Sequence, residues 1–323
     1  MSTEKKKPGR PKKVTDQKVQ KINGIVDYPT NSKYLAEVEC SNPSNFKKIC
    51  NCWKAINAKQ INWKFTPDKL VLSAIADGDK DHKDQKRVVI RTTIDGSRII
   101  SHYCPTPISI DIPVTGLEAL FNRLDKKYDS IGFIIQSKSE RMTILLTNEN
   151  EITEHLSILC TMSNDIDHYM NNLYISTNDT VITDPIFDNS IVAPIKFKLD
   201  WKYFKKTISN TAKFEKDIAI QHNMDHDGLT FTYTGTNTDA AIIPPRSKMP
   251  ELEVDPQLRL TVSIHNVNLK PISTSCLAPF IYFKAWSDRD LWLWTILNDD
   301  AITIDISVPI VDYSKSGNRL SLM

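Results

Sequence analysis

The chain has 323 residues, and its 41 basic and 39 acidic side chains give a formal net charge of +2. Hydrophobic residues at 40% and charged residues at 25% are typical of a globular chain of one or two domains. No apolar run approaches the length of a membrane span, so we expect no membrane partner, and nine glycines are too few for a chain built around nucleotide-cradling loops.

The chain begins with a basic arm. Residues 1–21 hold eight Lys/Arg and two Asp/Glu, whereas the rest of the chain sums to a net charge of −4. The centre of the arm, KPGRPKK at 7–13, is kept extended by its prolines, and we expect residues 1–30 to be disordered. Basic arms bind polyanions through counterion release.

The stretch resembles an AT-hook, a motif that binds the DNA minor groove. By that resemblance the DNA contacts of the arm are Lys7, Gly9, Arg10, Pro11, Lys12 and Lys13. A nuclear-import signal and a merely solubilising tail remain open alternatives.

The elements that follow alternate between strands and helices. The pattern predicts a strand at 33–40, a helix at 43–57, strands near 60–75, 86–95 and 98–103, a helix at 116–127 and three more strands. Asn42 and Pro43 favour an N-cap followed by proline at the first helical position, and Thr115 to Glu118 form a capping-box pattern.

The chain repeats itself at an offset of about 150 to 160 residues. FKKICNCWKAI at 46–56 matches FKKTISNTAKF at 204–214, and IGFIIQSKSERMTILLT at 131–147 matches FIYFKAWSDRDLWLWTIL at 280–297. We therefore predict two similar domains, 31–160 and 194–312, joined by a connector at 161–193 and followed by a tail at 313–323. Each domain contains a strand–helix–strands unit twice.

Three of the predicted helices carry basic outer faces opposite their apolar stripes. A charged outer face is commonly just a solvated face. The chain outside the basic arm is net acidic, however, so the concentration of positive charge on three related helices favours a functional role for these faces. The residues are Lys47, Lys48 and Lys54 on the first helix, Arg123 and Lys126 on the second, and Lys202, Lys205, Lys206 and Lys213 on the third.

Candidate catalytic and metal sites fail on inspection. The acidic loop at 77–84 lacks the Gly and Glu of a calcium loop, and His222 and His226 come just before Asp227-Gly228, a hairpin-turn signal. Cys50 and Cys52 have no partner pair for zinc, and no Walker A or dinucleotide fingerprint occurs. The six scattered cysteines favour reduced thiols in an intracellular protein. We expect no metal, no cofactor and no enzymatic activity.

The two-domain pattern resembles the DNA sliding clamps of the proliferating cell nuclear antigen (PCNA) type, over roughly residues 33–312. The most specific stretches are FKKICNCWK and TIDGSRIISHYCPTPISIDIPVTGLEALFNRL. The resemblance implies an α+β fold of two similar domains, each of two βαβββ units. Three subunits would form a ring with helices lining the inside and sheets outside, and the lysines of the basic helix faces would meet double-stranded DNA.

The resemblance also implies a subunit interface and a partner groove. The edge strand at 152–160, with His155, Leu156 and Ile158, would meet a strand near 240–248, with Ile242, of the next subunit. Met162, Ile166 and Tyr169 of the connector would line a groove for peptides of a DNA polymerase and other replication or repair proteins. Alternatively, these apolar side chains merely fasten a long linker to the body.

Some features depart from cellular clamps. Pro271 interrupts the expected fourth helix region (265–276), the connector is long, and the basic arm has no counterpart. Such divergence is expected of clamp-like proteins of large double-stranded DNA viruses, such as African swine fever virus. Localisation is then expected in the nucleus or in a viral replication factory in the host cytoplasm.

The predicted function is a DNA sliding clamp and polymerase processivity factor. Two alternatives remain: a clamp-fold viral late transcription factor, and a DNA-architectural protein that binds through its arm. Oligomeric state separates these hypotheses, since a ring needs several identical subunits.

Overall fold

The computed structural model describes most of the chain between residues 20 and 311. The described residues are 20–22, 25–27, 34–76, 88–124, 127–137, 139–149, 151–163, 192–211, 217–222, 228–234, 239–254, 259–275, 277–287, 290–297 and 301–311.

Four βαβββ units follow one another along the chain, as the sequence predicts. The first is β3 (Tyr34–Ser41), α1 (Ser44–Ala55), β4 (Gln60–Phe65), β5 (Lys69–Ile75) and β6 (Val89–Asp95). The second is β8 (Ile108–Pro113), α2 (Val114–Phe121), β9 (Ser130–Gln136), β10 (Arg141–Asn148) and β11 (Glu151–Leu159). The third is β13 (Ile195–Asp200), α4 (Trp201–Thr211), β14 (Asp217–His222), β15 (Leu229–Thr234) and β16 (Asp239–Ile242). The fourth is β18 (Leu260–His265), α5 (Asn266–Ser275), β19 (Phe280–Ala285), β20 (Leu291–Leu297) and β21 (Ile302–Val308). The α+β fold class is confirmed.

Short elements lie between and before the units. They are β1 (Gln20–Ile22), β2 (Ile25–Asp27), the 3-10 helix η1 (Gly96–Arg98), β7 (Ser101–Tyr103), β12 (Thr161–Met162), the 3-10 helix η2 (Arg246–Lys248) and β17 (Glu253–Val254). The strands β1 and β2 form a hairpin that joins the sheet beside β7. The segment 1–30, expected to lack regular structure, therefore contains two short strands near its end.

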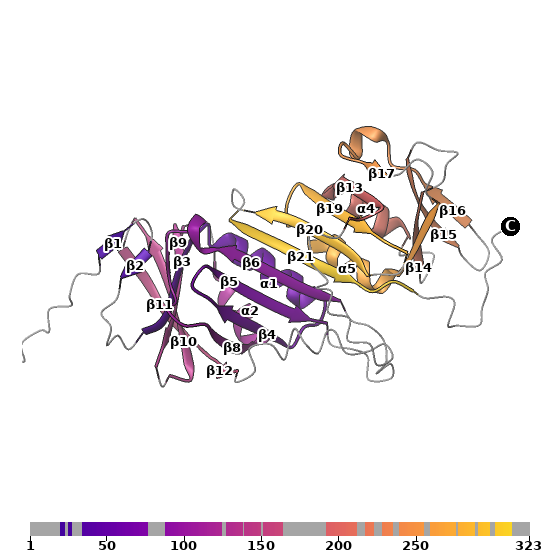
Figure 1. Cartoon of the computed structure of the whole chain (residues 1–323). Helices are drawn as coiled ribbons and strands as arrows, with labels where there is room; N and C mark the ends of the chain where they lie inside the picture. Colours follow the sequence, from indigo (N-terminus) through magenta and orange to yellow (C-terminus); the bar gives the residue numbers. More distant parts are fainter. Residues whose placement is uncertain are drawn as a thin grey trace, which may run out of the picture.

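The strands form three sheets. The largest has ten strands in the order β12-β8-β4-β5-β6-β21-β20-β19-β13-β17 and crosses from the first half of the chain into the second. The other two are β1-β2-β7-β3-β9-β10-β11 in the first half and β16-β15-β14-β18 in the second. Figure 1 shows β21 lying beside β6 of the first half, with β20 on its other side.

The internal seam is the antiparallel pairing of β6 with β21, which joins the two halves of the chain. Six residue pairs form it, from Ile302 opposite Ile94 to Ser307 opposite Val89. At its centre Arg91 Nη2 lies 3.1 Å from Asp305 Oδ2, and Trp292 Nε1 donates a hydrogen bond of 3.1 Å to Asp305 Oδ1. The seam thus combines backbone pairing with a mostly buried ion pair.

Each half has an equivalent aromatic contact between a helix and a sheet. Phe46 of α1 packs on Phe133 of β9 with ring centroids 5.0 Å apart, and Phe204 of α4 packs on Phe283 of β19 at 5.4 Å. All four rings are fully buried. Apolar burial of this kind supplies most of the stabilisation that holds the helices on the sheets.

The helix boundaries differ from those predicted. Pro43 stands at the N-cap of α1 and no side chain caps it. The second helix begins at Val114 rather than after a Thr115 cap, because the chain passes directly from β8 into α2 and the Val114 amide donates to Lys59 O at 2.9 Å. Pro271 does not interrupt α5 but lies within it.

None of the helices in the described part of the chain is long and apolar enough to cross a membrane.

Candidate nucleic-acid interface

The four described helices lie side by side, in the order α2-α1-α5-α4, against the sheets (Figure 1). Between them the helices carry seven basic residues and one acidic residue, Glu118. The basic residues are Lys47, Lys48, Lys54, Lys202, Lys205, Lys206 and Lys270. We call this row of helices the helix wall. Its charge contrasts with the near-neutral chain as a whole, and lysines on regular elements are suited to phosphate contacts that do not read sequence.

Two of the three α1 lysines are engaged with α2. Lys47 Nζ donates to Asn122 O at 3.3 Å, and Lys54 Nζ forms an ion pair with Glu118. Lys48 is exposed and has no partner among the described residues. Glu118 was expected to cap its own helix. The pairing with Lys54, 64 positions away, has no local sequence signal.

The α4 helix presents three exposed lysines, Lys202, Lys205 and Lys206. Its start is fixed by Asp200, whose Oδ1 accepts a hydrogen bond of 2.9 Å from the Tyr203 amide, as an N-cap carboxylate does. None of the three lysines is ion-paired with another residue of the described ranges. This helix therefore provides the densest group of free positive charge on the helix wall.

The α5 helix contributes little charge. Lys270 is its only basic residue, while Val267 is exposed. Pro271 has no amide proton, and the hydroxyls of Thr274 and Ser275 donate to Pro271 O at 2.8 and 3.0 Å. The helix is also held on its neighbours, since Trp201 Nε1 of α4 donates to Ser273 O at 3.1 Å.

The contact between α1 and α5 contains a buried thiol. Cys52 of α1 is fully buried, the Ser275 hydroxyl lies beside its thiol, and burial raises its pKa to about 11. Sequence periodicity places Cys52 outside the apolar stripe of α1, because that stripe marks only the helix face that packs on the sheet. Here a second buried face meets the other half of the chain.

Several predicted DNA contacts lie outside the described residues. These are the whole arm motif with Lys7, Gly9, Arg10, Pro11, Lys12 and Lys13, together with Lys126 and Lys213. Arg123 is described: it follows α2 and is exposed. The structure thus brings Lys47, Lys48, Lys54, Arg123, Lys202, Lys205 and Lys206 onto or beside one row of helices.

The predicted interface strands lie at sheet edges. The β11 strand, with His155, Leu156 and Ile158, is the last strand of the seven-stranded sheet, and β16, which ends at Ile242, is the last of the four-stranded sheet. His155 is exposed, Leu156 and Ile242 are half-buried, and Ile158 is buried next to Gly116 of α2. An open strand edge presents unpaired backbone groups that can accept another strand.

The predicted partner groove is described only at the margins of the connector. Met162 is 44% exposed in β12, which pairs with β8 at the end of the ten-stranded sheet, whereas Ile166 and Tyr169 lie outside the described residues. At the other end of the connector, Val192 O accepts a hydrogen bond of 3.1 Å from Trp286 Nε1.

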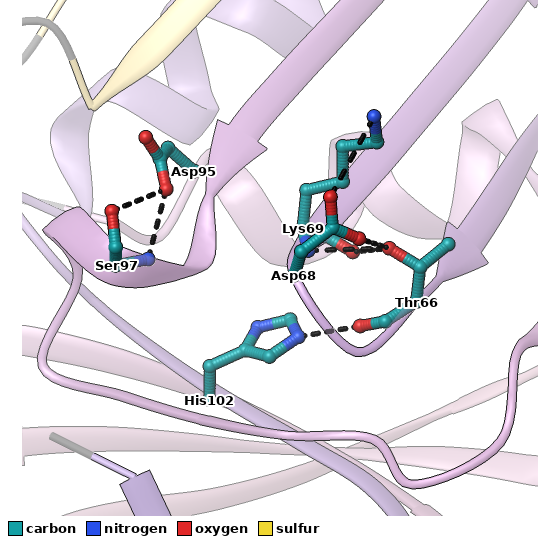
Figure 2. A network of polar contacts seen from close by, with 6 residues as sticks. All are labelled: Thr66, Asp68, Lys69, Asp95, Ser97 and His102. Atoms are coloured by element: carbon teal, nitrogen blue, oxygen red, sulfur yellow. Dashed lines mark hydrogen bonds and ion pairs between the residues drawn. The ribbon is translucent and has the colours of Figure 1, made fainter.

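A polar network links β7 of the seven-stranded sheet to turns next to β4 and β6 of the ten-stranded sheet (Figure 2). His102 Nε2 donates to Thr66 O at 2.6 Å, because a carbonyl oxygen can only accept. Asp68 accepts from Thr66 Oγ1 at 2.7 Å, and Asp95 accepts from Ser97 Oγ at 2.7 Å and from the Ser97 amide at 2.9 Å. These hydrogen bonds lower the pKa of both carboxyls.

The same network explains a glycine between the two turns. The Gly96 amide donates to Asp68 O at 2.9 Å, and a Cβ at position 96 would lie only 2.7 Å from that oxygen. Each carboxylate is satisfied within its own turn, and the hydrogen bond from Gly96 to Asp68 O joins the two turns. No group of three or more His, Cys, Asp or Glu side chains able to hold a metal occurs among the residues the structure places.

Comparisons with known proteins identify the fold. No family model and no curated protein matches the sequence. Among solved structures, the chain is similar to PCNA of Entamoeba histolytica, with a TM-score of 0.65 and 11% identity over 86% of this chain and 100% of that one. It is also similar to PCNA of Thermococcus kodakaraensis, with a TM-score of 0.65 and 11% identity over 85% and 100%.

A third similar structure is PCNA of A. fulgidus, with the C-terminal region of FEN-1 bound to it, at a TM-score of 0.63 and 10% identity over 86% of this chain and 98% of that one. The chain therefore has the fold of a PCNA sliding clamp over most of its length, as the sequence resemblance predicts. The expected likeness to clamps of large DNA viruses stays a prediction.

Proposed function

We propose that three copies of this chain form a ring around double-stranded DNA and act as a sliding clamp that holds a DNA polymerase, or other replication and repair proteins, on its template. The observation that carries the proposal is the helix wall, where seven lysines stand against a single acidic residue. Flexible lysines neutralise phosphates without stopping at a sequence, which suits a ring that must move along the duplex.

The internal seam supports ring closure. Inside the chain, the last strand of the first unit (β6) pairs with the last strand of the fourth (β21). The last strands of the second and third units, β11 and β16, are the corresponding free edges. If β11 of one copy pairs with β16 of the next, every unit meets its neighbour in the same way and a closed ring of copies leaves neither edge open.

Partner binding is proposed at the connector. The A. fulgidus PCNA of similar fold is bound to the C-terminal region of FEN-1. In this chain Met162, Ile166 and Tyr169 would contribute to such a groove, and the basic arm with Arg10 would add contacts to A·T-rich DNA outside the ring.

The decisive experiment measures topology. The full chain should sediment at about 110 kDa, three times the 36.8 kDa of one chain. After incubation with a nicked circular plasmid it should remain bound through a high-salt wash and be released when the plasmid is linearised. A ring can slide off a free end, whereas a DNA-architectural protein is indifferent to ends. Equal retention on circular and linear plasmid would contradict the clamp function.

A further inference from the structure

The second half of the chain carries aromatic side chains on the face of the ten-stranded sheet that points away from the helices. Phe283 of β19 packs on Phe204 of α4, and successive strand residues point to opposite faces, so Tyr282 points away from α4. Tyr282 lies opposite Trp294 of β20, with ring centroids 5.1 Å apart and ring planes at 16° to each other. We call this surface the aromatic face. It consists of the exposed Phe280 and Ile296 and the half-buried Tyr282 and Trp294.

The first half of the chain shows that the fold does not require these rings. Phe133 of β9 packs on Phe46 of α1 as Phe283 packs on Phe204, so the strand registers of the two halves can be matched from these residues. The positions that match Phe280, Tyr282, Trp294 and Ile296 are then Ser130, Gly132, Leu145 and Thr147. The equivalent sheet thus forms with small or aliphatic side chains at these positions, and the aromatic face must have a role other than folding.

The accessible charge beside the aromatic face is negative. Lys198 pairs with Glu251 at 2.7 Å, and its Nζ lies 4.6 Å from the centre of the Phe280 ring. The side chain of Lys198 is only 17% exposed, whereas that of Glu251 is 52% exposed. In the neighbouring pair of Lys196 with Glu253 the exposed fractions are 38% and 67%. A molecule that approaches this face therefore meets carboxylates before lysines, which favours a basic partner.

The basic arm of the chain has the composition that fits such a surface. Its centre, KPGRPKK at 7–13, contains Pro8 and Pro11 among five basic residues. Segments of the form Pro-x-x-P favour the polyproline II helix and bind aromatic-lined surfaces, because a preformed helix loses little entropy on binding. The arm thus combines prolines for the aromatic rings with positive charge for the carboxylates.

The arm is also long enough to reach the aromatic face of its own copy. It precedes β1, which pairs with β2, and β2 pairs with β7. From β7 a path leads through the hydrogen bond between His102 and Thr66 to β5, and then across β6 and β21 to β20 (Figure 2). Strand spacings of about 4.8 Å make this path about 40 Å long, and the straight distance is shorter. The stretch from Pro8 to Gln20 spans about 40 Å when extended.

We propose that the arm docks on the aromatic face of its own copy when no DNA is bound. Its two prolines lie against the rings of Tyr282 and Trp294, and its basic residues lie beside Glu253. Arg10 cannot contact this carboxylate and a DNA phosphate at the same time, so the aromatic face and DNA compete for the arm. Docking therefore lowers the affinity of the arm for DNA. The inference does not rest on the proposed ring, because it concerns a single copy.

The test measures how accessible the arm is in the full chain without DNA. The double variant Phe280→Ser with Trp294→Leu gives the second half the residues of the first. A docked population of about 90% predicts that tryptic cleavage after Lys13, followed by mass spectrometry, is about tenfold faster in this variant, because the protease cuts only the undocked arm. The affinity for a short A·T-rich duplex at low salt should rise by up to the same factor, since only the undocked arm binds DNA.

Two further variants test the two kinds of contact. Pro8→Ala with Pro11→Ala keeps the charge of the arm and leaves the body unchanged, whereas Glu253→Lys leaves the aromatic face unchanged. Each should also speed the cleavage. The matched control is Leu145→Ala with Thr147→Ala, at the equivalent positions of the first half, and it should alter neither the cleavage nor the affinity for duplex.

Three results would overturn the proposal. One is an equal cleavage rate in the natural chain, the Phe280→Ser/Trp294→Leu variant and the proline variant. Another is protection that disappears on dilution, which would assign the aromatic face to the arm of another copy. The third is a difference in duplex affinity that persists after residues 2–19 are deleted, which would mean that the aromatic face acts on DNA directly. Each result can be read in a monomer as well as in a ring, so failure of the proposed function would be seen separately.

Discussion

Lys54 of α1 forms an ion pair with Glu118 of α2, and Glu118 is the one acidic residue on the described helices. The pair withdraws a lysine from the positive face of the helix wall. Replacing Glu118 with Gln frees Lys54 and removes the negative charge from the helix wall. The variant should bind duplex more tightly, with the salt dependence of log K steeper by up to about 0.9 per chain, measured by titration at several salt concentrations.

The matched control for this change is Glu251→Gln. Glu251 also pairs with a lysine, Lys198, at 2.7 Å. Lys198 belongs to β13 of the ten-stranded sheet and not to the helix wall. An equal gain in DNA affinity for both variants would mean that general charge, rather than the helix wall, governs binding.

Reversing the free lysines of the helix wall should abolish DNA retention. The set is Lys48, Lys202, Lys205 and Lys206, which are exposed and carry no ion pair with another described residue. Changing all four to Glu should leave the thermal unfolding midpoint nearly unchanged, since none is on an apolar face, and should eliminate retention on nicked circular plasmid. Lys64 and Lys196 on sheet strands serve as the control, and their reversal should leave retention intact.

The arm should act through salt-sensitive contacts. Deleting residues 2–19 is expected to weaken binding to linear duplex at low salt and to leave sedimentation of the assembly unchanged, because up to about six basic residues of the arm neutralise phosphates. Arg10→Ala should erase a preference for A·T-rich over G·C-rich duplex, whereas Lys12→Ala should lower both affinities alike. Equal affinity of the intact chain for the two duplexes would leave the arm as a generic basic tail or import signal.

The Arg91–Asp305 pair should give stability a defined pH dependence. Burial raises the pKa of Asp305 above its ordinary 3.8, although Arg91 opposes the shift. A raised pKa means that the folded chain holds this proton more tightly, so the contribution is greatest below the ordinary value and is lost as pH rises through the raised one. The unfolding free energy of the natural chain minus that of Asp305→Asn should therefore fall as pH rises above the ordinary value of 3.8, measured with denaturant.

Two further variants check the sign and size of this effect. Asp95 has a lowered pKa because Ser97 donates to it, so Asp95→Asn should show the opposite trend, with the advantage of the natural chain lost as pH falls. Arg91→Met leaves a buried carboxylate without its partner and should cost about 3 kcal/mol. A pH-independent difference for Asp305→Asn would refute the assigned shift.

The connector hypothesis can be separated from simple fastening. If Tyr169 contributes to a partner groove, Tyr169→Ala should weaken binding of a polymerase-derived peptide while the unfolding midpoint barely changes. A loss of stability without an effect on peptide binding would support the alternative, in which the apolar residues hold the linker on the body. Fluorescence anisotropy of a labelled peptide and calorimetry of the same sample provide the two measurements.

Apolar periodicity and repetition in the sequence predict the βαβββ units, but they do not predict the contacts between the units. The apolar period of Phe46, Ile49 and Trp53 predicts both a helix and its buried face, and repetition of such stretches predicts two similar halves. The pairings Lys54–Glu118 and Arg91–Asp305 join residues 64 and 214 positions apart, and a single sequence carries no period or spacing that links them.

Helix ends show the same limit at short range. The capping-box pattern from Thr115 to Glu118 predicts a start that the structure does not use, because the amide of Val114 is already satisfied by Lys59 O from a different segment. Pro271 was expected to disrupt a helix that instead forms, with nearby hydroxyls bonded to its carbonyl and Trp201 bonded to Ser273 O. In both cases a tertiary contact overrides a local preference.

The ten-stranded sheet that runs through both halves has a mechanical consequence. Because β6 and β21 are paired and α1 is packed on α5, the two halves of the chain cannot move independently about the connector. The two halves should behave as one rigid body, and they should stay together even when the polypeptide between them is cut. Proteolytic cleavage within residues 164–191 should give two fragments that remain associated under native conditions and melt together in a single cooperative transition.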